Sequence, residues 1–510
     1  MGHDDEAQLT AVEQPHHDIR RELEAAVAPI ARSLDGRSFE LQAPVDEPVQ
    51  PGSYVSIETG GGAVLGQVVE SRLDLREGPE VETTGTLGTY RTRVAYHVVG
   101  GRGVVLEEAA PFHEAPLRTA EPAEVGAYLD RTAPKRARLE IGHLAFAPDV
   151  PARLDAGGFG RHTFLCGQSG SGKSYALSVM LEQLLLDTDL RIVVLDPNSD
   201  FARLPETRDG ADPEKAARWA ERAQHMEVRR SGGTGPGRLH MRFFDLGARS
   251  RAAVAELDPL RDRDEYSALL NVIEREASGA TVAELEESVR DPSPEEAALS
   301  LRIRNLGLLE WSIWSREDRE SGLLERLGED DWRALVVDLG SIQVERERAA
   351  VAEAVLAELW ELRDRRRPTL CVIDEAHNVC PATTGEPLTA LSTEHAVRIA
   401  GEGRKFGLHL LVSTQRPSKV HDNVLSQCDN LVLMRMNSAA DIAHLTGLFS
   451  YAPASLIERS TVFRQGEALV AGGIVGHPTF VRVGGRISQE GGSDVPADWA
   501  ADRGARAPGG

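Results

Sequence analysis

Residues 167–174 read GQSGSGKS, which has the form GxxxxGKS/T of a phosphate-binding loop. A short apolar run, Thr163–Cys166, precedes this loop and is typical of a buried parallel strand. After it, apolar residues recur at helical spacing between Leu177 and Leu185. A strand, a glycine-rich turn and a helix N-terminus direct several backbone N–H groups toward one point, where a triphosphate can bind. This context favours a nucleotide site over a chance Gly- and Ser-rich turn.

Each residue type in the loop has a physical role. Gly170 and Gly172 let the backbone curl around the phosphates, where a Cβ atom would intrude. We expect Lys173 to reach the β- and γ-phosphates and the Ser174 hydroxyl to ligate Mg²⁺. The expected cofactors are therefore ATP and Mg²⁺. The predicted nucleotide-binding residues are Gly167, Gln168, Ser169, Gly170, Ser171, Gly172, Lys173, Ser174 and Tyr175.

Two carboxylates follow a second apolar strand. Residues 370–373 read LCVI, and Asp374 and Glu375 come directly after them. Phosphoryl transfer needs an acidic group that holds Mg²⁺ beside the loop serine, and Asp374 fits this role through a water molecule. Glu375 is placed to act as the general base on the attacking water. Such a pair alone is a weak signal, but on a separate strand downstream of a phosphate-binding loop it is strong.

A third apolar strand, Leu408–Val412, is followed by the polar residues 413–417, which read STQRP. A polar side chain at this strand end can contact the γ-phosphate or the water and report hydrolysis. We assign that role to Gln415. The alternative is a helix cap or a turn before Pro417.

Composition limits the class of protein. With 510 residues the chain implies two or three domains, and 41% apolar residues suffice for their cores. The net charge of −23 argues against a broadly basic surface, although it allows a local basic channel. The first residues lack a signal-peptide pattern, and no apolar stretch is long enough to span a membrane, so we expect a cytoplasmic protein. The four cysteines show no CxxC spacing and no pairing pattern, and Cys166 and Cys371, which lie inside apolar runs, are interpreted as core residues.

The pattern along the chain predicts an α/β protein with a small N-terminal β-barrel. Short β runs split by Gly and Pro begin at Ser38, and from Thr163 strands alternate with helices, as in a parallel sheet. The predicted divisions are an N-terminal extension with a possible helix at 18–31 (1–35), a barrel (36–116), a Pro- and Ala-rich linker (117–150), a P-loop core (151–485) with a helical insertion (about 201–330), and a flexible tail (486–510). The predicted core strands are 163–166, 192–196, 334–339, 369–373, 408–414, 431–435, 468–471 and 479–483.

A basic stretch lies inside the predicted insertion. Residues 229–238 read RRSGGTGPGR on an acidic background. It could be a pore loop that tracks phosphates along a nucleic acid. A solvated hairpin loop is at least as good an explanation.

Several motifs keep a fixed order along the chain. They are Arg161-His162, the phosphate-binding loop, 194–201 (VLDPNSDF), 373–377 (IDEAH), 402–407 (EGRKFG), 413–417 (STQRP) and 425–428 (LSQC). Together they resemble HerA-type ATPases, relatives of the FtsK translocases. The β region from Ser38 resembles the N-terminal barrel of that family.

The resemblance implies a recA-like P-loop core in a hexameric ring, with nucleotide at the subunit interfaces and double-stranded DNA threaded through the centre. It also implies a separate nuclease partner. By position, Arg404 matches an arginine that completes the neighbouring subunit's site, and Arg161 matches a second one. The alternative for Arg404 is a surface charge at a helix C-terminus, which the helix dipole favours.

Two other functions fit parts of the sequence. Residues 374–377 read DEAH, as in DEAH-box RNA helicases, but the chain has one such core and no second recA-like half. In the other alternative, the ring is an ATP-gated scaffold that activates a separate effector, such as a nuclease in an anti-phage pair, with little translocation. The sequence has no nuclease motif of its own, so either HerA-like function requires a partner.

Overall fold

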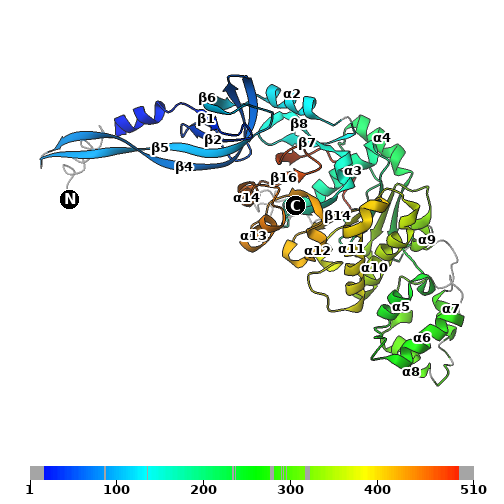
Figure 1. The fold of residues 1–510 in the computed structure, drawn as a ribbon. Helices are drawn as coiled ribbons and strands as arrows, with labels where there is room; N and C mark the ends of the chain where they lie inside the picture. Colours follow the sequence, from blue (N-terminus) through cyan, green and yellow to red (C-terminus); the bar gives the residue numbers. More distant parts are fainter. Residues whose placement is uncertain are drawn as a thin grey trace, which may run out of the picture. The chain divides into compact units, whose positions relative to one another are not determined.

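The computed structural model describes residues 17–492, apart from 86–87, 135, 233–234, 236, 276–280, 289, 291, 295 and 316–321. The chain divides into two compact units (Figure 1). One unit contains residues 17–136, 142–155 and 431–483, and the other contains 137–141, 156–430 and 484–492. The predicted mixed α/β class is confirmed.

The first unit contains a closed β-barrel. Its strand order is β1-β2-β5-β4-β3-β6, closed by antiparallel pairs of β6 with both β1 and β3. The strands are β1 (Ile30–Ser33), β2 (Ser38–Ala43), β3 (Tyr54–Thr59), β4 (Gly62–Gly85), β5 (Gly88–Val105) and β6 (Phe112–Thr119). The barrel begins before residue 36 because β1 follows a helix that ends at residue 25, not at 31. Its equivalence to the HerA-type barrel stays a prediction.

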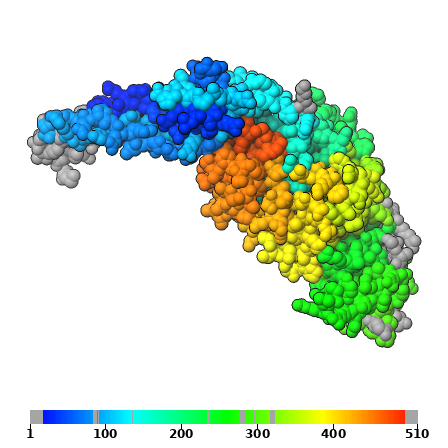
Figure 2. Space-filling model, in the orientation of Figure 1, coloured from blue at the N-terminus to red at the C-terminus, as the bar shows by residue number. Residues whose placement is uncertain are grey.

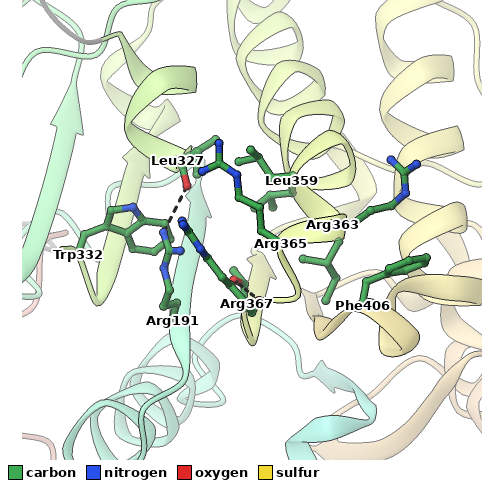
Figure 3. Close-up of a pocket in the computed structure, with 11 residues that line it drawn as sticks. Arg191, Leu327, Trp332, Leu359, Arg363, Arg365, Arg367 and Phe406 are labelled. Atoms are coloured by element: carbon green, nitrogen blue, oxygen red, sulfur yellow. Dashed lines mark hydrogen bonds between the residues drawn. The ribbon is translucent and has the colours of Figure 1, made fainter. Parts of the chain in front are cut away.

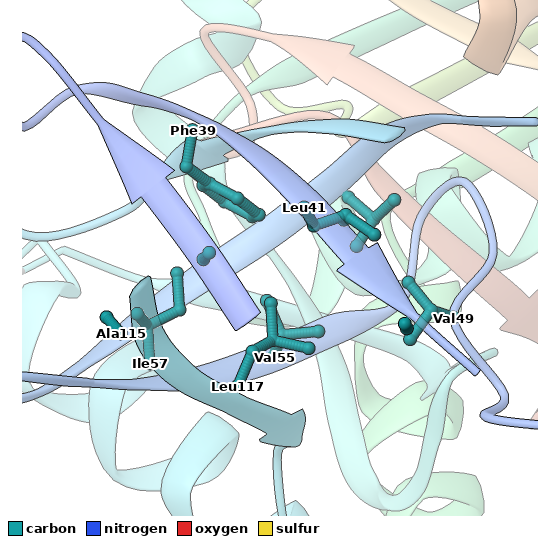
Figure 4. Close-up of a cluster of buried hydrophobic side chains, with 10 residues drawn as sticks. Phe39, Leu41, Val49, Val55, Ile57, Ala115 and Leu117 are labelled. Carbon is teal, nitrogen blue, oxygen red and sulfur yellow. The ribbon is translucent and has the colours of Figure 1, made fainter. Parts of the chain in front are cut away.

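Alternating side chains fill the barrel. In β2, Phe39 and Leu41 point inward and are almost fully buried, and Ile57 and Leu117 meet them from β3 and β6 (Figure 4). A Cβ atom at Gly103 would lie 2.1 Å from the Phe39 ring. Glycine is required there because the aromatic ring occupies the space that a side chain would take.

Strands β4 and β5 continue beyond the barrel as a two-stranded ribbon (Figures 1 and 2). Their register runs from Gly66↔Val105 to Gly85↔Gly88. An isolated two-stranded ribbon is marginally stable in water. The N-terminal helix supports this ribbon, since the Arg20 side chain donates to the Ala95 carbonyl at 2.9 Å.

Residues 117–150, expected as a linker, instead carry regular structure. They contain α2 (Pro122–Thr132), β7 (Arg138–Leu144) and the start of β8 (Ala147–Asp155). Helix α2 starts with a reciprocal capping box between Glu121 and Glu124 and buries Val125 and Tyr128. The helix therefore has its own start signal and an apolar face, which the Pro- and Ala-rich composition obscures. The first unit also contains α13 (Ala439–Leu448), α14 (Ala454–Glu458), β16 (Glu467–Gly472) and β17 (Thr479–Val483).

The second unit is built on a parallel sheet with the strand order β11-β12-β10-β13-β14-β9. Strands β9, β10, β12 and β13 are buried along their whole length, and β14 is buried except at the half-buried His409, as expected where helices cover both faces. The strands are β9 (His162–Cys166), β10 (Arg191–Asp196), β11 (Met226–Arg230), β12 (Ala334–Asp338), β13 (Thr369–Ile373) and β14 (Leu408–Thr414). The predicted strands 163–166, 192–196, 334–339, 369–373 and 408–414 agree with these bounds to within one residue. Strand β15 (Cys428–Leu433) begins three residues earlier than predicted.

The predicted insertion starts too early. Helix α4 (Pro213–Ala223) and strand β11 belong to the core, because β11 pairs in parallel with β12 and Trp219 of α4 is fully buried. The helices that follow are α5 (Ala248–Val254), α6 (Arg263–Arg275), α7 (Val282–Ser288), α8 (Ala297–Asn305) and α9 (Leu323–Gly328). The helical part of the insertion therefore begins after residue 247.

Three longer helices accompany the sheet: α3 (Lys173–Asp187), α10 (Glu345–Glu361) and α11 (Pro387–Glu402). Cys166, Cys371, Cys380 and Cys428 are buried free thiols, and the predicted core positions of Cys166 and Cys371 are confirmed. Among the described residues, no helix combines the length and the apolar character needed to cross a bilayer.

A candidate nucleotide-binding site

The phosphate-binding loop connects the end of β9 to the first residue of α3. Gly170 has φ 72° and Gly172 has φ 94°, backbone conformations that side chains with a Cβ atom rarely adopt. Helix α3 begins at Lys173, directly after these glycines. The loop therefore has the curled backbone that the sequence predicts, at a helix N-terminus suited to an anion.

Lys173 lies at the centre of a buried polar cluster. Its ammonium donates to Asp374 Oδ1 at 2.6 Å and to Ser413 Oγ at 3.0 Å, and Glu375 Oε1 is 3.2 Å away. The strand order explains this convergence, since β14 lies between β9 and β13 and each strand ends at the same edge. Burial lowers the pKa of Lys173, but the charges of Asp374 and Glu375 outweigh it, and the net shift is upward.

Glu375 is held in a left-handed backbone conformation, with φ 43° and ψ 50°. Such a conformation costs a non-glycine residue about 1–3 kcal/mol and persists where the surroundings fix it. Gln415 Nε2 donates to Glu375 Oε1 at 2.9 Å, and His377 Nδ1 lies 3.3 Å from Glu375 Oε2. The structure therefore brings Glu375, which follows β13 closely, into contact with Gln415, which follows β14.

Sequence reasoning missed the contribution of β10 to this site. The Ser174 hydroxyl donates to Asp200 Oδ2 at 2.7 Å. Asp196, at the end of β10, accepts from the backbone N–H groups of Asn198, Asp200 and Phe201. Burial raises the pKa of Asp196 to about 7, with nearby carboxylates adding to the shift. The sequence does contain a signal for this contribution, because the predicted strand 192–196 ends in the acidic residue Asp196.

The cluster has the chemistry that a triphosphate and Mg²⁺ require. Ser171 Oγ and Asp374 Oδ2 are buried and have no hydrogen-bond partner among the described residues. A buried oxygen without a partner costs free energy unless a ligand or water satisfies it. Mg²⁺ prefers oxygen ligands and usually takes one or two protein groups together with substrate phosphates. Ser174 and Asp374 fit this donor set.

Arg161 and Arg404 lie together, apart from Lys173 and its carboxylates. The Arg161 guanidinium donates to Asp429 Oδ2 at 2.7 Å, and Arg404 Nη1 is 3.8 Å from the same oxygen. Each of the three side chains is about half exposed, at 48–49%. Within the part of the chain described, this carboxylate is the ion-pair partner of both arginines. Because Arg161 and Arg404 share the single carboxylate of Asp429, this cluster keeps a net positive charge that can bind an anion from outside the subunit.

Residues 486–492, expected as part of a flexible tail, are ordered beside α3. Glu182, a fully buried residue of α3, accepts from the backbone N–H of Ile487 at 2.8 Å and from the Ser488 backbone N–H and hydroxyl at 2.8 and 2.6 Å. The Arg486 N–H donates to the Tyr175 hydroxyl at 3.3 Å. We call residues 484–492 the C-terminal strap. The tail composition hid it because the groups that hold it, among them the buried Glu182 carboxylate, lie far away in the sequence.

The basic stretch 229–238 is partly built into the core. Arg229 is buried beside Glu227, and Arg230 Nε lies 2.9 Å from Asp338 Oδ2. Both arginines belong to β11, and the buried Arg229 cannot contact a nucleic acid, whereas the Arg230 side chain is exposed. A pore loop can begin only after residue 230.

A separate pocket lies at the opposite edge of the sheet, where β10, β13 and β14 begin (Figure 3). The Arg191 guanidinium stacks 3.5 Å from the Trp332 ring centroid, and its Nη2 donates to the carbonyls of Leu327 and Glu329. Arg367 donates to Asp330 at 2.5 Å. These contacts tie the segment before β12 to the starts of β10 and β13, and the pocket is not the nucleotide site.

Comparisons with known proteins show which chains this one is similar to. Residues 139–359 match the family described as "Helicase HerA, central domain". A DNA double-strand break repair helicase HerA of Pyrococcus furiosus is 24% identical over 397 residues, which cover 68% of this chain and 69% of that protein. A probable helicase of Methanocaldococcus jannaschii is 22% identical and covers 90% of this chain and 91% of its own length. Among solved structures, VirB4 of Thermoanaerobacter pseudethanolicus is 14% identical, with a TM-score of 0.47, over 72% of this chain and 99% of its own.

Proposed function

Because this chain is a P-loop ATPase of the HerA type, we propose that it hydrolyses ATP to move double-stranded DNA through a ring of identical subunits. The observation that supports hydrolysis most directly is the convergence of Lys173, Asp374, Glu375 and Ser413 beside the phosphate-binding loop. DNA as the substrate is supported by similarity to a protein named as a DNA double-strand break repair helicase.

In the proposed reaction, each residue near the loop has one task. Lys173 exchanges its contact with Asp374 for the β- and γ-phosphates. Ser174 would hold Mg²⁺ directly and Asp374 would hold it through a water, and the metal when bound would neutralise charge on the transferring phosphoryl group. Glu375 accepts a proton from the attacking water. Gln415 holds the Glu375 carboxylate and senses the γ-phosphate.

Arg404 and Arg161 are proposed to act on the nucleotide of the neighbouring subunit. Both side chains are half exposed and point to Asp429, while Lys173 already supplies the cation for the subunit's own phosphates. An arginine supplied in trans stabilises the charge of the transition state. The proposal implies a ring with shared sites, six-membered by resemblance to HerA-type ATPases.

A subunit-mixing experiment tests the shared site. Arg404→Ala rings and Glu375→Gln rings are each expected to be inactive, because every site lacks one essential group. Mixed rings contain interfaces at which an intact Arg404 faces an intact Glu375, so ATPase activity should partly return after dissociation and reassembly. Native mass measurement must confirm exchange of subunits. Fully exchanged rings without recovered activity, or an active monomer, would exclude the trans role.

Stimulation of the ATPase distinguishes a DNA motor from an effector scaffold. For a motor, double-stranded DNA should raise ATP turnover severalfold, and shortening the loop 231–237 should remove the increase while leaving β11 in place. ATP turnover with and without duplex DNA, at fixed salt because phosphate contacts are salt-dependent, is the measurement. An ATPase that ignores DNA but responds to a purified nuclease partner would support the scaffold instead.

A further inference from the structure

The Ser174 hydroxyl already has a hydrogen-bond acceptor. It donates to Asp200 Oδ2 at 2.7 Å, across 26 residues of sequence. A hydroxyl group has one proton and two lone pairs. Donating the proton to Asp200 directs a lone pair of Ser174 away from that carboxylate, where it can bind a cation.

Asp200 is itself held from two sides. Its backbone N–H donates to Asp196 Oδ1 at 3.1 Å, and its carbonyl accepts from the Gly491 N–H of the C-terminal strap at 3.1 Å. A Cβ atom at Gly491 would lie 2.1 Å from the Ser199 carbonyl oxygen, so the strap lies close against this loop. The strap in turn is anchored by Glu182. This support fixes the loop that carries Asp200.

Ser199, the residue before Asp200, also helps to fix the Asp200 loop. Ser199 has φ 61°, an uncommon conformation for a residue with a Cβ atom, and its hydroxyl donates to Asp338 Oδ1 at 2.7 Å. Asp338 pairs in register with Asp196 across β12 and β10. The ends of the neighbouring strands β10 and β12 therefore fix the backbone of the loop that contains Asp200.

We propose that Asp200 is the positioning residue for the metal-binding serine. By accepting the hydrogen bond of the Ser174 hydroxyl, Asp200 orients the Ser174 oxygen toward Mg²⁺. The C-terminal strap keeps Asp200 in place. The inference rests on the proposed nucleotide site and adds a residue that the loop motif does not contain. Partners of this kind, which hydrogen-bond to a metal ligand, typically change metal affinity by about 10–100-fold when removed.

The experiment measures nucleotide binding rather than turnover. Binding of a non-hydrolysable ATP analogue is titrated by calorimetry, first with a chelator and then over a range of Mg²⁺ concentrations. For Asp200→Ala, the affinity without metal should stay within about twofold of wild type. The Mg²⁺ concentration for half-maximal enhancement should rise at least about tenfold. Asp200→Asn retains an acceptor oxygen and should recover most of this loss.

Two controls separate positioning from a general structural role. Asp209→Ala removes an exposed carboxylate with the same change in charge and should leave the Mg²⁺ titration unchanged. In a Ser174→Ala background, Asp200→Ala should have no additional effect, because Asp200 acts through the serine. An unchanged Mg²⁺ titration in Asp200→Ala, or an additive loss in the double variant, would overturn the inference while the ATPase function stands. Absence of nucleotide binding by the wild-type protein would overturn both.

Discussion

Replacing Glu375 by glutamine is expected to slow ATP turnover by about 10²–10⁴-fold while ATP still binds. Glutamine keeps the size of the side chain and can still contact Gln415, but its amide cannot accept the proton of the attacking water. Lys173 and the loop glycines, which contact phosphates, are unchanged. Steady-state phosphate release gives the turnover, and equilibrium binding of ATP to the slow variant gives the affinity.

The matched control for this variant is Glu214→Gln. Glu214 is an exposed residue of α4, a helix that contributes no residue to the cluster, so the substitution makes the same change in charge outside the site. It should leave both turnover and binding at the wild-type level. Equal turnover of the Glu375→Gln variant and wild type would remove Glu375 as the general base.

Replacing Lys173 by methionine is expected to affect both binding and stability. Charge-assisted hydrogen bonds contribute about 1.5–3 kcal/mol each, so ATP affinity should fall by at least about tenfold. In the nucleotide-free protein the same substitution leaves Asp374, which has no exposed surface, without its ammonium partner. Breaking a buried ion pair from one side costs about 3–5 kcal/mol. Chemical denaturation followed by circular dichroism measures this loss.

A second substitution tests the cause of the expected instability. Asp374→Asn added to Lys173→Met removes the unpaired charge, and it should recover much of the lost stability without restoring ATP binding. If Lys173→Met unfolds at the same denaturant concentration as wild type, the ion pair does not stabilise the nucleotide-free state. If it binds ATP normally, Lys173 does not contact the phosphates.

The core of the fold and the centre of the site could be predicted from local sequence. The strands around the loop are continuous apolar runs, and each ends in the polar residues that carry the chemistry, as with Ile373 followed by Asp374. Because parallel strands end at one edge of a sheet, residues 374–375 and 413–415 had to meet near the loop. The glycines with positive φ followed from the loop motif itself.

The parts that were missed depend on long-range contacts or on atypical composition. Strand β11 is short and contains Glu227, Arg229 and Arg230, so it lacks an apolar run; its pairing with β12 defines it. The composition of the strap residues is typical of a flexible tail, and only the folded structure shows that they bind the Glu182 carboxylate. Asp200 follows Pro197 in a turn, and only the folded loop places its carboxylate beside Ser174.

The strap also has a consequence for synthesis on the ribosome. Ile487 is added to the chain 305 residues after Glu182, the group that binds it. At about 5–20 residues per second, this interval is on the order of 15 to 60 s. Throughout it, the emerging phosphate-binding loop and α3 exist without the segment that fixes the Asp200 loop, and the Glu182 carboxylate lacks the strap donors that it has in the finished protein. The nucleotide site is therefore completed only when the strap emerges, long after the phosphate-binding loop itself has been made.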